Sequence, residues 1–249
     1  MAKKKEGMEL TVEEKSPTLE QIEVAPELLK QYVSGESEMF SYGLGEKLFM
    51  NDLEQRILYL DDEVTPDTFR EVTMFIVKMN MIDSGIPIEE RLPIKIVINS
   101  QGGSILDGLG LIDVIKVSKT PVITVGMGYC MSMAFNIFVA GDLRVAMPNA
   151  TFLCHDGSTE MYDSTMKFRD TVAFYDKVDE RLDRMIASKS KLTIKELNDR
   201  KRQENFWFAD EGKELGFVDY IIGEDITLDD IFGYAEEECD CKECNCDKE

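Results

Sequence analysis

The amino-acid sequence predicts an α/β domain with a largely parallel sheet, because β-rich runs alternate with helical patterns along the chain. The runs at residues 94–99 and 122–125 each end in glycine and lead into a helical apolar pattern. A third run, residues 151–154, precedes a long helix expected over about residues 164–188. Strands that alternate with helices in this way favour a parallel sheet whose faces are covered by helices.

Each element has its own signal. Residues 56–60 predict a first strand, and Thr65-Pro66 then supplies an N-cap and a first helical residue for a helix over residues 66–80. In the next units we expect the 122–125 strand to end at Gly126 and Gly128, before an apolar helix within residues 131–140. The long helix carries one apolar stripe, formed by Tyr175, Val178, Leu182, Met185 and Ile186.

The chain is expected to divide into three parts. Residues 1–40 are polar and charge-mixed and predict an N-terminal extension, either flexible or axial, whereas residues 41–226 carry the core patterns. Residues 227–249 predict an acidic, cysteine-rich tail, whose last fifteen residues hold seven acidic side chains and four cysteines. The spacing Cys-x-Cys-x2-Cys-x-Cys at residues 239–246 could hold a soft metal ion. A solvated tail fits this composition better, so we predict no metal and no cofactor.

The charge balance excludes several partners. A formal net charge of −21 repels phosphate backbones and anionic lipid surfaces, so neither nucleic acid nor membrane is an expected partner. No apolar run reaches the length of about 18 residues that a membrane-spanning helix needs. The first residues are basic without an apolar segment behind them, which predicts a cytosolic protein without disulfides.

Three features together could carry acyl-transfer chemistry. Ser132 follows a strand and a glycine turn at the start of an apolar helix, where unpaired N–H groups favour developing negative charge. His155 is the only histidine of the chain and follows a short strand, where it could act as a general base. Gly102-Gly103 could form an anion-binding turn. Each has a plainer explanation: a helix cap, a structural histidine, or close packing, a phosphate site or a thioester-oxygen site.

Four segments, in order, resemble the ClpP family of serine peptidases. The sequence I-N-S-Q-G-G-S at residues 98–104 is similar to the family's I-N-S-P-G-G-S, and residues 126–134 resemble its nucleophile segment. Residues 147–150, before His155, resemble the P-N-S segment that leads to the family's base. Residues 206–219 are similar to its closing F-x-[ST]-A-x-E segment. The similarity covers about residues 50–222 and implies a ClpP/crotonase-like spiral of β-β-α units with a long protruding helix.

The resemblance assigns roles to individual residues. It makes Ser132 the nucleophile and His155 the base, with the amides of Gly102 and Met133 as the oxyanion hole. The family's triad aspartate falls on Glu204, counted back from the phenylalanine at 206, and Asp199 is the alternative.

The sequence also departs from the family's pattern at several positions. Gln101 replaces a proline, Gln203 replaces the arginine before the triad acid, and Asp156-Gly157 replaces Gln-Pro. These departures resemble divergent, phage-type members of the family.

The implied function is an ATP-dependent-type serine endopeptidase in the cytosol. Its subunits would form homo-oligomeric rings, heptameric and single or stacked, and cleave unfolded polypeptide delivered by a separate AAA+ unfoldase. This chain has no G-x-x-x-x-G-K-[S/T] loop, so we do not expect it to hydrolyse ATP. The alternatives are a catalytically weak structural ring subunit, a phage head-maturation peptidase, and acyl-CoA chemistry of the crotonase type.

Overall fold

The computed structural model describes residues 51–158, 162, 164–202 and 204–233 of the chain. Its centre is a seven-stranded sheet in which five strands follow the order β1-β2-β3-β4-β7, all parallel to their neighbours. β5 is parallel to the end of β3, and β6 is antiparallel to β5. The strands are β1 (Ile57–Leu60), β2 (Ile94–Ser100), β3 (Val122–Met131), β4 (Leu143–Ala146), β5 (Thr151–Cys154), β6 (Asn205–Phe208) and β7 (Tyr220–Ile221).

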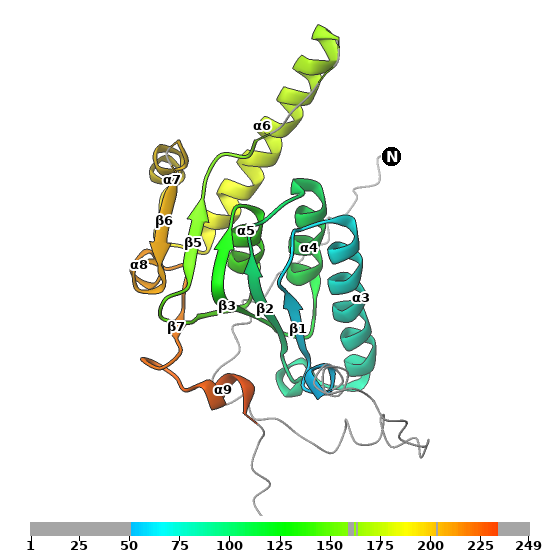
Figure 1. The fold of residues 1–249 in the computed structure, drawn as a ribbon. Coiled ribbons are helices and arrows are strands. Elements are labelled where there is room, and N and C mark those ends of the chain that lie inside the picture. Colours follow the sequence, from blue (N-terminus) through cyan, green and yellow to red (C-terminus); the bar gives the residue numbers. More distant parts are fainter. Residues whose placement is uncertain (1–50, 159–161, 163, 203, 234–249) are drawn as a thin grey trace, which may run out of the picture.

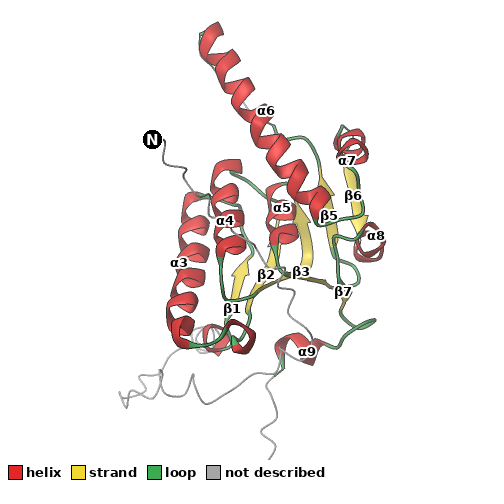
Figure 2. Cartoon of the chain, turned by 180° about the vertical axis from the view of Figure 1, so that it is seen from behind, coloured by secondary structure: helices red, strands yellow, loops and turns green. Residues whose placement is uncertain are grey.

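The helices cover the sheet and extend beyond it. Helices α3, α4 and α5 lie side by side against the first strands, whereas α6 projects away from the body of the molecule (Figures 1 and 2). The predicted α/β fold with a parallel sheet and a long protruding helix is therefore confirmed. The described helices are α3 (Pro66–Ile82), α4 (Ile105–Val117), α5 (Met133–Ala140), α6 (Thr165–Ser188), α7 (Ile194–Lys201), α8 (Ala209–Leu215) and α9 (Leu228–Phe232), with 3₁₀ turns η2 (Asp83–Gly85) and η3 (Ile88–Glu90).

The start of α3 follows from its sequence. The side chain of Thr65 accepts a hydrogen bond from the Thr68 amide at 3.3 Å, and Pro66 occupies the first turn, where its missing N–H is not needed. Val72, Ile76 and Met79 are buried at helical spacing. The expected cap of this helix is therefore confirmed.

The predicted end of the 122–125 strand at Gly126 and Gly128 is wrong. β3 continues through Gly128 to Met131, because its first half pairs with β2 and β4 whereas its last three residues pair with β5. The glycines of this strand allow neighbouring side chains to pack closely against its backbone. A Cβ atom on Gly128 would lie 2.4 Å from the side-chain oxygen of Asn99. β3 therefore carries the chain directly from the sheet to Ser132.

A cluster of aromatic rings holds together the elements on either side of the β3–β5 junction. Phe135 of α5 lies with its ring centroid 6.3 Å from Phe152 of β5, 5.9 Å from Trp207 of β6 and 5.1 Å from Phe217. All four side chains are buried. Each such side chain contributes about 1.5–3 kcal/mol through burial, and the edge-to-face pairs add to this. The cluster therefore fixes the start of α5 relative to the end of β5.

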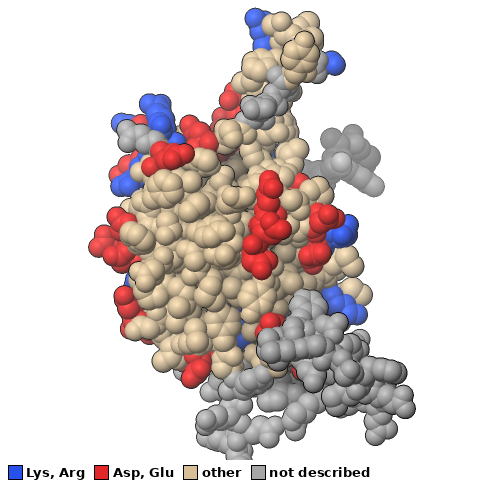
Figure 3. Space-filling model, viewed as in Figure 1, with Lys and Arg blue, Asp and Glu red and all other residues tan. Residues whose placement is uncertain are grey.

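The outer part of α6 leaves the core. Its inner half buries Val178, Leu182, Met185 and Ile186, as the predicted stripe requires, with Tyr175 packed at the edge. Its outer half carries exposed apolar side chains, namely Met166, Phe168, Val172 and Phe174. In Figure 3 acidic side chains are spread over the visible face, and basic ones occur at the outer end of α6.

The last described element is α9, which lies in the segment 227–249 that the sequence places in the tail. A capping box between Thr227 and Asp230 begins this helix, and Ile231 is buried in a second apolar cluster with Ile222 and Ile226. The four tail cysteines and the extension 1–40 lie outside the described residues. Within the described ranges, no helix is long and apolar enough to cross a membrane.

Candidate active site

Ser132 stands at the junction between β3 and α5, in a strained backbone conformation. Its φ of 53° and ψ of −122° lie in a region that residues other than glycine rarely adopt, at a cost of about 1–3 kcal/mol. Its amide donates to the carbonyl of Leu153 in β5 at 2.9 Å, which holds the junction in place. Its side chain makes no capping hydrogen bond. The plainer explanation of Ser132 as a helix cap therefore lacks the contact it requires.

The Gly102 backbone lies directly beside Ser132. Gly102 has a φ of 99°, and a Cβ atom on it would lie 2.8 Å from the Met133 amide nitrogen and 2.9 Å from the Ser132 Cβ. Only a residue without a side chain allows this approach. The glycine turn and the first amide of α5 are thus adjacent, as an oxyanion hole between them requires.

The two glycine amides point to different places. The Gly102 amide donates to Ser100 Oγ at 3.1 Å. Val64 pairs with Gly103 in a parallel bridge, donating to the Gly102 carbonyl and accepting from the Ser104 amide. In a parallel bridge of this kind, the N–H of the central residue, Gly103, points away from its partner. The Gly103 amide therefore faces away from Val64.

His155 follows β5 and lines the same pocket as Ser132. It is half-buried, whereas Cys154 before it is buried, and burial raises the pKa of the Cys154 thiol to about 12. That thiol is therefore neutral near pH 7 and is no candidate nucleophile. Within the described part of the chain, no hydrogen bond joins Ser132 and His155. Catalytic hydrogen bonds are often long without substrate and shorten when it binds.

The strand pairing separates the two candidate triad acids. Antiparallel pairing of β5 with β6 places Cys154 opposite Asn205, so the next step of the register places His155 opposite Glu204. Opposite residues of an antiparallel pair have their side chains on the same face. Asp199 instead lies within α7 with an exposed side chain. Glu204 is also exposed, and no hydrogen bond from it to His155 is formed among the described residues.

A buried ion pair beside the pocket was not predicted. The Lys201 ammonium lies 2.7 Å from Asp183 Oδ1 and 3.6 Å from Asp156 Oδ1. The side chains of Lys201 and Asp183 are only 6% and 7% exposed. Burial lowers the pKa of Lys201, but the hydrogen bond that its ammonium donates to Asp183 and the charges of the neighbouring carboxylates raise it by more, so this side chain is charged.

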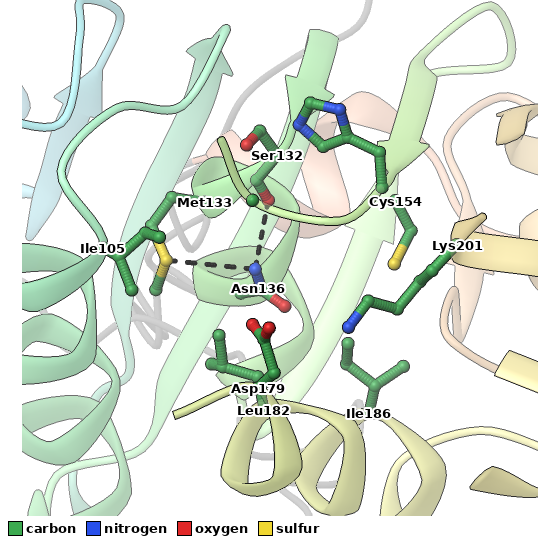
Figure 4. Close-up of a pocket in the computed structure, with 11 residues that line it drawn as sticks. Ile105, Ser132, Met133, Asn136, Cys154, Asp179, Leu182, Ile186 and Lys201 are labelled. Carbon is green, nitrogen blue, oxygen red and sulfur yellow. Dashed lines mark hydrogen bonds between the residues drawn. The ribbon is translucent and has the colours of Figure 1, made fainter. Parts of the chain in front are cut away.

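The pocket joins the candidate catalytic residues to polar groups below them (Figure 4). The Asp179 carboxylate points toward the Asn136 side chain in this view. Asn136 donates to the Ser132 carbonyl at 3.2 Å, but its own side-chain oxygen is buried without a partner in the described structure. The lining residues are Ile105, Ser132, Met133, Asn136, Cys154, His155, Gly157, Asp179, Leu182, Ile186 and Lys201.

One sequence signal could have identified part of this polar group. Asp183 falls between Leu182 and Met185 inside the apolar stripe of α6, and a buried carboxylate at such a position needs a cation or a donor. The identity of that cation could not be read from the sequence, because Lys201 belongs to a different helix. No group of residues among those described has the composition and closeness of a metal site.

Comparison with known proteins identifies the family. Residues 43–225 match the family model described as Clp protease. This match covers most of the chain and includes the strand–glycine–helix units, Ser132 and His155. The chain therefore belongs to the Clp protease family and is a Clp-type, ClpP-like peptidase.

Individual relatives agree with this assignment. The chain is 31% identical over 186 residues to ATP-dependent Clp protease proteolytic subunit 1 of Streptomyces avermitilis, covering 72% of this chain and 79% of the relative. It is 27% identical over 178 residues to ATP-dependent Clp protease proteolytic subunit 2 of Tropheryma whipplei, covering 71% and 96%. Subunit 1 of Streptomyces coelicolor is 27% identical over 182 residues, covering 72% and 80%.

Proposed function

We propose that this chain is a serine endopeptidase subunit in which Ser132 is the nucleophile and His155 the general base. The observation that carries the proposal is the junction at Ser132, where a strained serine begins a helix, beside a glycine turn and in one pocket with the only histidine. Backbone strain of this kind is concentrated at functional sites. Membership of the Clp protease family supports the same reaction.

The chemistry follows from these positions. His155 accepts the hydroxyl proton while Ser132 Oγ attacks the carbonyl carbon of the scissile peptide bond. The resulting tetrahedral intermediate loses its amine, which takes the proton from His155, and leaves an acyl group on Ser132. Water, deprotonated by His155, then releases the carboxylic acid and restores the serine. Glu204 opposite His155 would accept the second ring N–H and keep the imidazole oriented.

The oxyanion needs two amide donors beside Ser132. The Met133 amide is the first N–H of α5 and lies where the helix dipole favours negative charge. Gly102 is the predicted second donor, although its amide is bonded to Ser100 Oγ. The neighbouring Gly103 amide, which points away from Val64, is the alternative and requires no broken hydrogen bond.

The proposed assembly is a homo-oligomeric ring, heptameric and single or stacked, that encloses these sites and receives unfolded polypeptide from an AAA+ unfoldase. The exposed apolar side chains on the outer half of α6, including Phe168 and Phe174, support a contact between copies, since several such side chains on one projecting element are typical of an interaction surface. The relatives are named as subunits of ATP-dependent proteases, which supports an unfoldase as the partner that delivers the substrate.

The decisive experiment combines labelling with mutation. A fluorophosphonate probe should attach to Ser132 alone, as mass spectrometry of the digested protein would show. Ser132→Ala should abolish labelling and lower peptide cleavage by about 10⁴-fold or more, while native mass spectrometry finds the same oligomer. Cleavage at the wild-type rate by Ser132→Ala would refute the assignment. An unlabelled, inactive wild-type ring would instead indicate the structural-subunit alternative.

A further inference from the structure

The pocket below Ser132 is lined by one carboxylate, Asp179, and one ammonium, Lys201, and a second carboxylate, Asp183, lies beside it. Asp179 and Asp183, one turn apart on α6, face the single ammonium of Lys201. Lys201 forms its short ion pair with Asp183 and not with Asp179. Asp179 lines the pocket and makes no hydrogen bond and no ion pair with the described residues. One carboxylate is therefore left without a direct partner inside the pocket.

A second acceptor lies in the same space. The side-chain oxygen of Asn136 is buried and receives no hydrogen bond in the part of the chain described. In Figure 4 it lies on the side of Asn136 that faces Asp179. A buried acceptor without a donor is destabilising, by an amount comparable to a lost hydrogen bond. Two unpaired acceptors side by side call for a group that donates several hydrogen bonds.

The electrostatics of Asp179 agree with this geometry. Burial raises the pKa of its carboxyl group, and the positive charge of Lys201 offsets that effect only in part. A carboxylate with a complete ion pair would show the opposite direction, because an adjacent cation lowers the pKa. The other charged groups near it, Asp156, Asp176 and Asp183, are all acidic and act in the same direction as burial.

We propose that Asp179 determines specificity, and that this pocket takes a lysine or arginine side chain of the substrate, at the residue whose carbonyl Ser132 attacks. The proposal rests on the peptidase function proposed above. The walls contributed by Ile105, Met133 and Leu182 suit the aliphatic stem of such a side chain. Its cationic head carries three or five donors, enough for both Asp179 and Asn136.

Other side chains fit this pocket less well. An acidic side chain would bring a third carboxylate next to Asp179 and Asp183, with Lys201 already bonded to Asp183. An apolar side chain would leave the Asn136 oxygen and the Asp179 carboxylate unsatisfied and would exclude the water that could solvate them. The charge balance and the unpaired acceptors thus favour a cation.

The test compares three fluorogenic peptides that differ only in the residue before the scissile bond. Lysine and norleucine form a matched pair, since they share an unbranched aliphatic side chain and only lysine has the ammonium; glutamate is the third. With the full-length assembled protein, kcat/KM for the lysine peptide should exceed that for norleucine by about 10- to 100-fold. Asp179→Asn, which keeps the shape, should lower this ratio by at least about tenfold.

Two further variants separate charge in the pocket from charge elsewhere. Asp176→Asn makes the same change on the same helix, but Asp176 is exposed and does not line the pocket, so the ratio should persist. Asp179→Glu keeps the carboxylate and should retain a preference for lysine over norleucine.

Several results would overturn the proposal. A wild-type enzyme that cleaves norleucine as well as lysine, or a ratio that survives in Asp179→Asn, would remove the role of Asp179. Preference for glutamate would assign the pocket to Lys201 instead. If no peptide is cleaved and a fluorophosphonate does not label Ser132, the proposed function itself fails. Cleavage without a lysine preference refutes only the role of Asp179.

Discussion

Replacing Gly102 by alanine tests whether the glycine turn shapes the site, and other glycines of the chain provide matched controls. Gly102 combines a φ of 99° with a Cβ position that would lie 2.7 Å from the Met131 carbonyl oxygen and 2.8 Å from the Met133 amide nitrogen. Gly223 has a φ of 89° but open space around its Cβ position. Gly85 has open space and no such φ. The three substitutions thus separate backbone strain from contact.

The expected losses of stability follow from backbone strain and from close contact at the Cβ position. A left-handed conformation costs an alanine about 1–2 kcal/mol, so Gly223→Ala should lower the free energy of unfolding by that amount. Gly85→Ala should change stability by less than about 1 kcal/mol. Gly102→Ala should cost more than Gly223→Ala, because the atoms that must move belong to the backbone around Ser132. Movement of the Met133 amide should lower kcat by about 10²-fold or more, the usual loss of one oxyanion donor.

Urea unfolding and steady-state cleavage of one peptide measure both effects on the same samples. We expect Gly223→Ala and Gly85→Ala to keep the wild-type kcat, because neither residue lies near the pocket. Wild-type kcat in Gly102→Ala would refute the inference that the turn positions the nucleophile segment. Equal stability losses in Gly102→Ala and Gly223→Ala would show that the close contact costs nothing.

Two further predictions concern ionisable groups. Glu204→Gln should lower kcat substantially and Asp199→Asn should not, because only Glu204 is in register with His155; the reverse order in a kcat measurement would show that Asp199 orients the base. Burial lowers the pKa of Lys95 to about 8, with Arg56 acting in the same direction. The unfolded chain therefore binds more protons than the folded one between about pH 8 and pH 10.5, and stability gains a contribution as the pH rises through this range. Lys95→Met should be the more stable protein at pH 7, and its advantage in urea unfolding should shrink by about 1–3 kcal/mol at pH 10; an advantage that is independent of pH would contradict this.

The alternation of strands and helices could be predicted from sequence because its signals are local. Thr65 and Pro66 mark the start of α3 by themselves, and the apolar stripe of α6 repeats at helical spacing over residues 175–186. Ser132 was predicted near a helix start for the same reason, and it is the N-cap residue of α5. The roles of nucleophile, base and oxyanion hole come from the resemblance to the ClpP family, because a local pattern does not assign them.

The elements that sequence reasoning missed depend on distant partners. β4 contains Arg144 in a run of four buried residues, and such a residue does not resemble part of a strand core. Its guanidinium is accommodated by two hydrogen bonds to Asp219, 75 residues later. Lys201 and Asp183 satisfy each other in the same way across two helices. A pattern within a short stretch of sequence does not indicate such pairs, because the two partners are far apart along the chain.

The single tryptophan of the chain gives the catalytic region an optical reporter of its own. Trp207 is 5% exposed and packs against Phe135, three residues after Ser132, and Phe217, in a ring cluster that also contains Phe152 of the strand before His155. Its fluorescence emission should therefore change when the segments that carry Ser132 and His155 move relative to each other. Tyrosine residues, eight in all, are spread more widely. Comparing emission excited selectively from the indole with far-ultraviolet circular dichroism during denaturation would reveal whether this region loosens before the rest of the sheet, without any attached dye.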